Sequence, residues 1–130
     1  DDEDNFRSVV ETADSGFVAI GYHSPVANAQ RTMIAVRFDK TGAVVWSRLY
    51  PTIETTVCKA IVPGNGGGYV IAGSILNSIN GPEGLLFKID DQGDVLWSNA
   101  YAPDMLFNDA VRVNENVLAF VLGLRIGLGL

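Results

Sequence analysis

The acidic segment from Asp90 to Asp94 has residue types that could form a metal site. It reads Asp-Asp-Gln-Gly-Asp, and carboxylate and amide oxygens of this kind bind Ca²⁺ in proteins. The segment from Asp39 to Ala43 aligns with it, but two of the acids are lost and a lysine is gained. A tight hairpin turn explains both segments, because Asp and Gly suit the backbone conformations of such turns. We therefore predict a hairpin turn at each place and no metal ion.

Few residues are available for nucleophilic or redox chemistry. His23 is the single histidine and Cys58 the single cysteine, which excludes an internal disulfide and a multi-cysteine metal site. The sequence has no Gly-x-Ser-x-Gly motif, and Gly64 to Gly68 lacks the Gly-Lys-Ser/Thr ending of a phosphate-binding loop. We expect His23 to be a solvated loop residue, Cys58 a small buried apolar residue and 64–68 a hairpin turn. The sequence thus predicts no catalytic residue and no cofactor, and we expect that the protein is not an enzyme.

Composition and charge exclude several classes of partner. The chain has 130 residues, of which 48% are hydrophobic, so its apolar content suits one packed domain and excludes general disorder. The formal net charge is -6, and much of the excess acid lies in Asp1–Asp4. Without a basic patch, no nucleic-acid partner is expected. The apolar stretch from Val117 to Leu130 is shorter than the ~20 residues of a membrane-spanning helix and contains Arg125, so we predict no membrane span.

An internal repeat with a period of about fifty residues organises the chain. Gly-Phe-Val-Ala-Ile-Gly, which begins at Gly16, matches Gly-Tyr-Val-Ile-Ala-Gly, which begins at Gly68. A second pair of matching blocks covers residues 38–47 and 89–98, and both of these blocks end in Trp-Ser. The recurring residues are Gly16, Gly21, Asp39, Gly42, Trp46 and Tyr50 in the first unit, and Gly68, Gly73, Asp90, Gly93, Trp97 and Tyr101 in the second. We predict that these residues have structural roles.

Hydrophobic alternation and turn residues divide the chain into short strands. We expect a single repeat-built unit over 1–130, with a first repeat at about 6–50, a second at about 57–101 and a partial third at about 107–130. The predicted strands are 6–12, 16–22, 32–38, 43–50, 57–62, 68–74, 84–90, 94–101, 108–114 and 117–122.

The side-chain pattern predicts which strands are covered. The second strand of each unit is apolar on both faces, so we expect it to lie between two layers. The third strand is apolar on one face, with Ile34, Val36 and Phe38 in the first unit, and carries Arg37 or Lys88 on the other, so we expect it to be half-exposed. In the fourth strand we place Val44, Trp46 and Tyr50 on one face.

Four-stranded units of this length with one doubly buried strand are typical of propeller blades. We therefore predict an all-β fold with two four-stranded antiparallel propeller-type blades and the start of a third. The alternative is a β-sandwich made from duplicated units.

The motif Gly-Tyr-Val-x-Ala-Gly, followed by Lys-x-Asp-x-x-Gly-x-x-x-Trp-x-x-x-Tyr, resembles a repeat of bacterial and archaeal secreted or surface proteins. Those repeats are predicted to form propellers and mostly lack an assigned activity. The resemblance implies a location outside the cell or at its surface. The Asp-x-x-Gly-x-x-x-Trp part is also similar to the tryptophan-docking motif of pyrroloquinoline-quinone propellers, with one residue fewer between Asp and Gly. That similarity implies that Trp46 and Trp97 pack between blades and do not contact a cofactor.

A propeller has four to eight blades, so two blades and a part leave apolar faces open. We expect further blades of a longer chain or other copies, as in a homo-oligomer, to cover them. The function that follows is a non-catalytic structural or interaction module of a secreted or cell-surface protein, whose loops could contact a protein or a glycan. One alternative is a self-assembling filament or ring subunit. Another is a fragment of a quinone-dependent dehydrogenase propeller.

Overall fold

The described part of the chain is built from β-strands. A computed structural model describes residues 3–25, 31–51, 56–64, 66–76, 79, 81–103, 105–114 and 117–124, with side chains from residue 4 to residue 101. The strands are β1 (Glu3–Glu11), β2 (Phe17–Ser24), β3 (Thr32–Phe38), β4 (Val44–Tyr50), β5 (Thr56–Pro63), β6 (Tyr69–Ile75), β7 (Glu83–Ile89), β8 (Val95–Pro103), β9 (Met105–Asn114) and β10 (Val117–Leu124). Within these ranges, no helix is long and apolar enough to cross a membrane.

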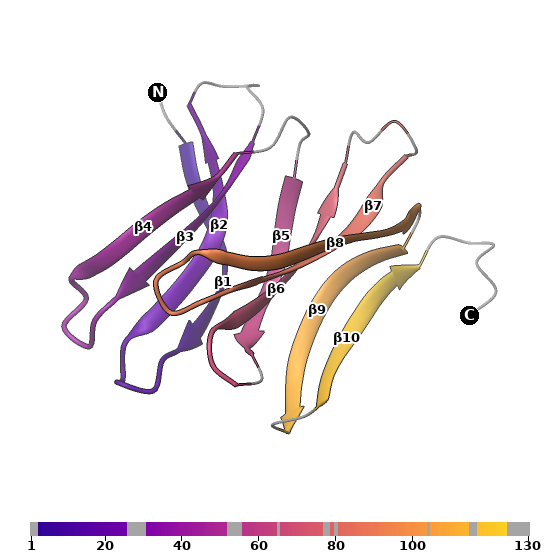
Figure 1. The fold of residues 1–130 in the computed structure, drawn as a ribbon. Coiled ribbons are helices and arrows are strands. Elements are labelled where there is room, and N and C mark those ends of the chain that lie inside the picture. The colour runs from indigo at the N-terminus through magenta and orange to yellow at the C-terminus, as the bar shows by residue number, and fades with distance from the viewer. Residues whose placement is uncertain are drawn as a thin grey trace.

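The strands form two four-stranded sheets and a hairpin (Figure 1). Sheet 1 has the order β1-β2-β3-β4, sheet 2 has the order β5-β6-β7-β8, and β9 pairs with β10. Every neighbouring pair is antiparallel. The predicted all-β fold with two four-stranded antiparallel units is confirmed, and a described strand overlaps each predicted one.

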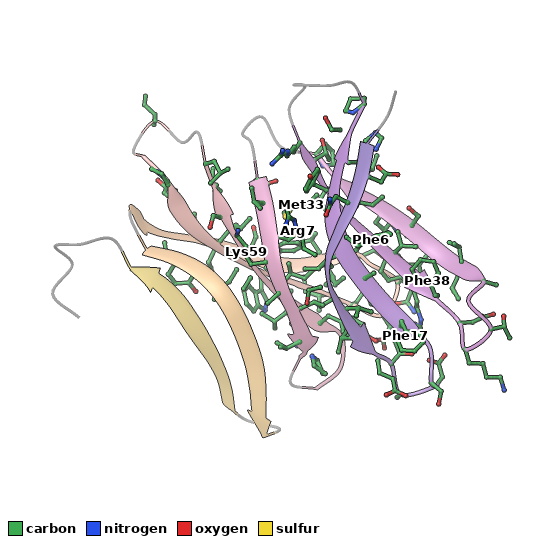
Figure 2. All side chains as sticks on the ribbon, turned by 180° about the vertical axis from the view of Figure 1, so that it is seen from behind. Phe6, Arg7, Phe17, Met33, Phe38 and Lys59 are labelled. Atoms are coloured by element: carbon green, nitrogen blue, oxygen red, sulfur yellow. The ribbon has the colours of Figure 1, made fainter. Side chains whose placement is uncertain are left out.

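The two sheets repeat each other down to their irregularities. The β1–β2 register shifts between Phe6 and Ser8, and the β5–β6 register shifts between Cys58 and Ala60. Each shift leaves one bulged residue, Arg7 or Lys59, at the same place in its sheet. Both residues are labelled in Figure 2, which views the molecule from behind. The hairpin register shifts at the corresponding place in β9.

Both sheets have a second bulge, between their third and fourth strands. The register places Val44 opposite Phe38 and Trp46 opposite Arg37, so Val44 and Trp46 lie on opposite faces of sheet 1. The predicted shared face is wrong, because strict alternation of side chains holds only where no residue is inserted into the strand.

The core lies between the sheets. We call the side of each sheet that faces the next sheet in the sequence its front face, and the opposite side its back face. Val18, Ile20 and Ala35 on the front face of sheet 1 form one buried cluster with Ile71 and Phe87 on the back face of sheet 2. All residues of β6 are buried, as expected for a strand between two layers. The hairpin covers the front of sheet 2 through contacts of β9 with β5, β6 and β7.

Gly21 and Gly73 take equivalent positions in β2 and β6, opposite the residue that precedes each bulge. A Cβ atom on Gly73 would overlap the carbonyl oxygen of Val57, and one on Gly21 would overlap that of Asn5. The bulged first strand therefore approaches so closely that only glycine fits, which explains the recurrence of this residue.

We predict that Gly73→Ala lowers the free energy of unfolding by about 1–3 kcal/mol, because the added methyl group must push β5 away. Urea denaturation of the variant and the parent protein measures this. Ser47→Ala on exposed β4 is the control and should change stability by less than ~0.5 kcal/mol. Equal effects of the two substitutions would contradict the close approach.

Candidate functional site

The turn between β7 and β8 is held in shape by one carboxylate. The Oδ1 atom of Asp90 accepts hydrogen bonds from the backbone N–H groups of Gln92 and Asp94, each at 2.9 Å. Gly93 closes the turn with φ 86°, a conformation that favours glycine. Asp90 and Gly93 recur in the sequence because they build this turn.

The turn between β3 and β4 has the same geometry. The Oδ1 atom of Asp39 accepts hydrogen bonds from the backbone N–H groups of Thr41 at 2.8 Å and Ala43 at 3.0 Å, and Gly42 has φ 88°. The hydroxyl of Thr41, followed by these N–H groups, lowers the pKa of Asp39. The two segments are hairpin turns. Among the residues with described side chains, no group of three or more His, Cys, Asp or Glu is placed to hold a metal ion.

Alternate residues of β4 contact the turn between β7 and β8 in sheet 2. Trp46 donates its indole N–H to the carbonyl oxygen of Asp91 at 2.9 Å, and the hydroxyl of Tyr50 donates to that of Gly93 at 2.7 Å. Between them, Nε of Arg48 donates to the carbonyl oxygen of Gln92 at 3.2 Å. Successive carbonyls of one sheet's turn are thus bound by one face of the other sheet's outer strand.

Arg37 on β3 adds a charged link. Its guanidinium donates to the carbonyl oxygen of Asp91 at 3.2 Å and pairs with the carboxylate of Asp14 at 2.9 Å. Arg48 and Asp94 form a longer ion pair of 3.6 Å. Both carboxylates are well exposed, so these pairs contribute little to stability beside the packed contacts.

The contact is also tightly packed. A Cβ atom on Gly93 would lie 2.8 Å from Cγ of Arg48 and 3.0 Å from the Trp46 ring, so glycine is needed here for space as well as for its φ angle. The ring of Tyr50 lies 5.5 Å from the ring of Phe87, centre to centre. Burial raises the pKa of Tyr50 to about 12.

Trp97 takes the place of Trp46 in sheet 2, since it lies opposite Lys88 as Trp46 lies opposite Arg37. It is 40% exposed, and its indole has no hydrogen bond to any other residue that the structure describes. The turn at Gly42 is equally open, because a Cβ atom there would meet nothing within 4 Å. The structure therefore joins Trp46 and Tyr50 to the turn at Gly93. Among the described residues, Trp97 and the turn at Gly42 do not take part in an equivalent contact.

The remaining recurring residues are Gly16, Gly68 and Tyr101. A Cβ atom on Gly16 would overlap the carbonyl oxygen of Phe38, and one on Gly68 would overlap that of Ile89. Each glycine therefore lets the loop before the second strand pass close to the end of the third. Tyr101 occupies the position in β8 that Tyr50 has in β4.

Sequence reasoning missed Arg48 as a part of the contact. It also placed Arg37 on an exposed face of its strand, which is wrong, because Met33 and Ala35 on that face are buried against sheet 2. Arg48 corresponds to Asn99 in the second unit, so the repeat gave no signal for it. Its spacing of two residues from both Trp46 and Tyr50, which places it on their face of the strand, could have identified it.

The two chemically reactive residues lie away from this contact. His23 lies within β2, not in a loop as expected, and its Nδ1 is 2.6 Å from the carboxylate of Asp4. Cys58 is 1% exposed, as predicted, and burial raises its pKa to about 12. A thiol that stays protonated at neutral pH is a poor nucleophile.

An apolar cleft of about 320 Å³ opens beside the contact. It is lined by Met33, Leu49, Tyr50, Leu85 and Phe87, among others. No acid and base converge in it, so its geometry suits packing more than catalysis.

No known protein-family model matches the sequence, and no curated protein matches it. The contacts in the structure are therefore the basis for its functional interpretation.

Trp46→Phe should lower the free energy of unfolding by about 1 kcal/mol, because it removes the donor to Asp91 while keeping an aromatic ring. Trp97→Phe is the matched control and should cost less than ~0.5 kcal/mol, since its indole has no such bond among the described residues. Chemical denaturation of both variants provides the comparison. A larger loss for Trp97→Phe would refute the assigned role of Trp46.

The raised pKa of Tyr50 predicts that stability falls at high pH. The unfolded phenol ionises at its ordinary pKa of 10.0 and the folded one at about 12, so the folded state loses stability as pH rises through this interval. Tyr50→Phe should make this decline shallower, with Cys58 and Tyr69, whose pKa values are also raised by burial, causing the remainder. Denaturation midpoints between pH 9 and pH 12 test this, and an unchanged decline would argue against it.

Proposed function

We propose that the protein is a non-catalytic structural and interaction module whose sheets are blades of a β-propeller-type repeat. The observation that carries this proposal is the docking of the outer strand of sheet 1, through Trp46 and Tyr50, on the turn of sheet 2. Both partners in this contact are repeated residues, so the contact can continue from one unit to the next.

The way the sheets stack supports blades over a duplicated sandwich. In a two-layer sandwich, each sheet has one face in solvent. Sheet 2 instead lies between sheet 1 and the hairpin, and all residues of β6 are buried. Strand β9 contacts β5, β6 and β7, in the same way that β5 contacts β1, β2 and β3. The hairpin therefore stands where the first half of a third blade would stand.

The back face of sheet 1 supports an interaction role. Phe6, Val9 and Phe17 on this face are 48%, 61% and 43% exposed. Their counterparts in sheet 2 are Cys58, Ile61 and Tyr69, which are at most 6% exposed because sheet 1 covers them. An apolar face of this kind marks an interaction surface. We propose that further blades or other chains cover it, outside the cell or at its surface as the resemblance implies.

Dye binding tests the open face. We predict that the folded chain binds an anilinonaphthalene sulfonate dye while it still unfolds cooperatively, because the apolar back face of sheet 1 is accessible. Phe17→Ser should reduce the dye fluorescence. Ile79→Ser is the control, since Ile79 is 97% exposed and does not belong to this face of sheet 1, and it should leave the signal unchanged. A cooperatively folded monomer that binds no dye would contradict the proposed function.

A further inference from the structure

Sheet 2 carries hydrogen-bond donors at the positions from which the outer strand of sheet 1 contacts the turn of sheet 2. Strand β8 carries Trp97 and Asn99 at the positions of Trp46 and Arg48, and both side chains are exposed. Indole and amide N–H groups can donate hydrogen bonds to the backbone carbonyl oxygens of a turn. The outer strand of sheet 2 is therefore equipped for a second turn of the Asp-x-x-Gly type.

The hairpin covers mainly the inner part of the same face. Its strand β9 lies chiefly against β5, β6 and β7 and contacts β8 least, while β10 pairs with β9 alone among the described strands. Figure 1 shows β10 on the outer side of the hairpin, near the C-terminal end of the chain. The edge of β10 away from β9 pairs with no other strand that the structure describes, and such an edge can accept another antiparallel strand.

These two features define the shape of an element that could dock here. By the order of sheet 1, a third sheet would continue from β10 with two further strands joined by a turn. In the existing contact, that turn is the one that meets the tryptophan. We propose that sheet 2 and β10 bind a β-hairpin of another polypeptide, whose first strand pairs with β10 and whose Asp-x-x-Gly turn accepts a hydrogen bond from the indole of Trp97.

The proposal rests on the proposed function and specifies the chemistry of its partner. The hairpin must have an Asp that accepts the turn N–H groups, a Gly with positive φ, and alternating apolar residues on the strands. The Asp39 and Asp90 turns of this chain share this geometry, which shows that it can be encoded in different sequences. Addition of strands to a free edge is a known mode of peptide binding.

A peptide with the sequence of residues 32–50, including Trp46→Phe, serves as the probe. The binding protein is the full chain with Trp46→Phe, so that Trp97 is the one tryptophan present. We expect saturable binding with a blue shift of Trp97 emission, because a half-exposed indole becomes enclosed. Absence of a saturable shift would overturn the proposal.

Two matched variants locate the contact. A peptide that also carries Asp39→Ala and Gly42→Val cannot form the turn and should bind roughly tenfold more weakly or worse. Trp97→Ala in the chain should weaken binding of the probe peptide to a similar extent by calorimetry, whereas Ser47→Ala on exposed β4 should retain it. Equal affinity of the Trp97→Ala chain would mean that the peptide binds elsewhere, for example in place of β3–β4, and would refute the site. Dye binding depends on the back face of sheet 1, so the proposed function can stand if this site fails.

Discussion

The structure depends on a row of backbone carbonyls that a tight turn leaves without partners in its own sheet. In the turn from Asp90 to Asp94, the Asp carboxylate binds the inward N–H groups, and the carbonyls of residues 91–93 point outward. Trp46, Arg48 and Tyr50 supply the donors from the neighbouring sheet. Polar groups at an interface must be paired to avoid a desolvation cost, so this arrangement fixes how the two sheets meet.

The stacking of sheets follows from this contact and from apolar burial. A four-stranded sheet with an apolar second strand has two faces to cover, and a neighbour of the same kind can cover each of them. Sheet 2 has both neighbours within the described chain, whereas the back face of sheet 1 has none there. The same repeat therefore produces a well-packed centre and an open end, which is why we interpret the chain as an interaction module.

Much of this fold could be predicted from local patterns. Alternation and turn residues located the strands, and the doubly apolar second strand of the second unit was correctly placed between layers. The same prediction is wrong for β2 in the first unit, because the back face of sheet 1 has no covering layer within the described chain. The bulges at Arg7 and Lys59 were not predicted, because an inserted residue leaves no clear mark on a short apolar pattern. The shared face assumed for Val44 and Trp46 was wrong for the same reason.

The candidate site was only partly predictable. Repetition identified Asp90, Gly93, Trp46 and Tyr50, but it could not show that the indole meets a carbonyl of the next sheet, because the acceptor is backbone and has no sequence signal. It also could not distinguish the enclosed Trp46 from the exposed Trp97, because their local sequences are alike and only their neighbours differ. Tertiary context decides that difference.

Hydrogen exchange of the two indole N–H groups, followed by NMR, tests the central claim most directly. The account predicts that the Trp46 N–H exchanges slowly, through opening of the contact between the sheets, while the Trp97 N–H exchanges rapidly. Rapid exchange of both groups, or slower exchange at Trp97, would contradict the claim that the tryptophan-to-turn contact holds the sheets together.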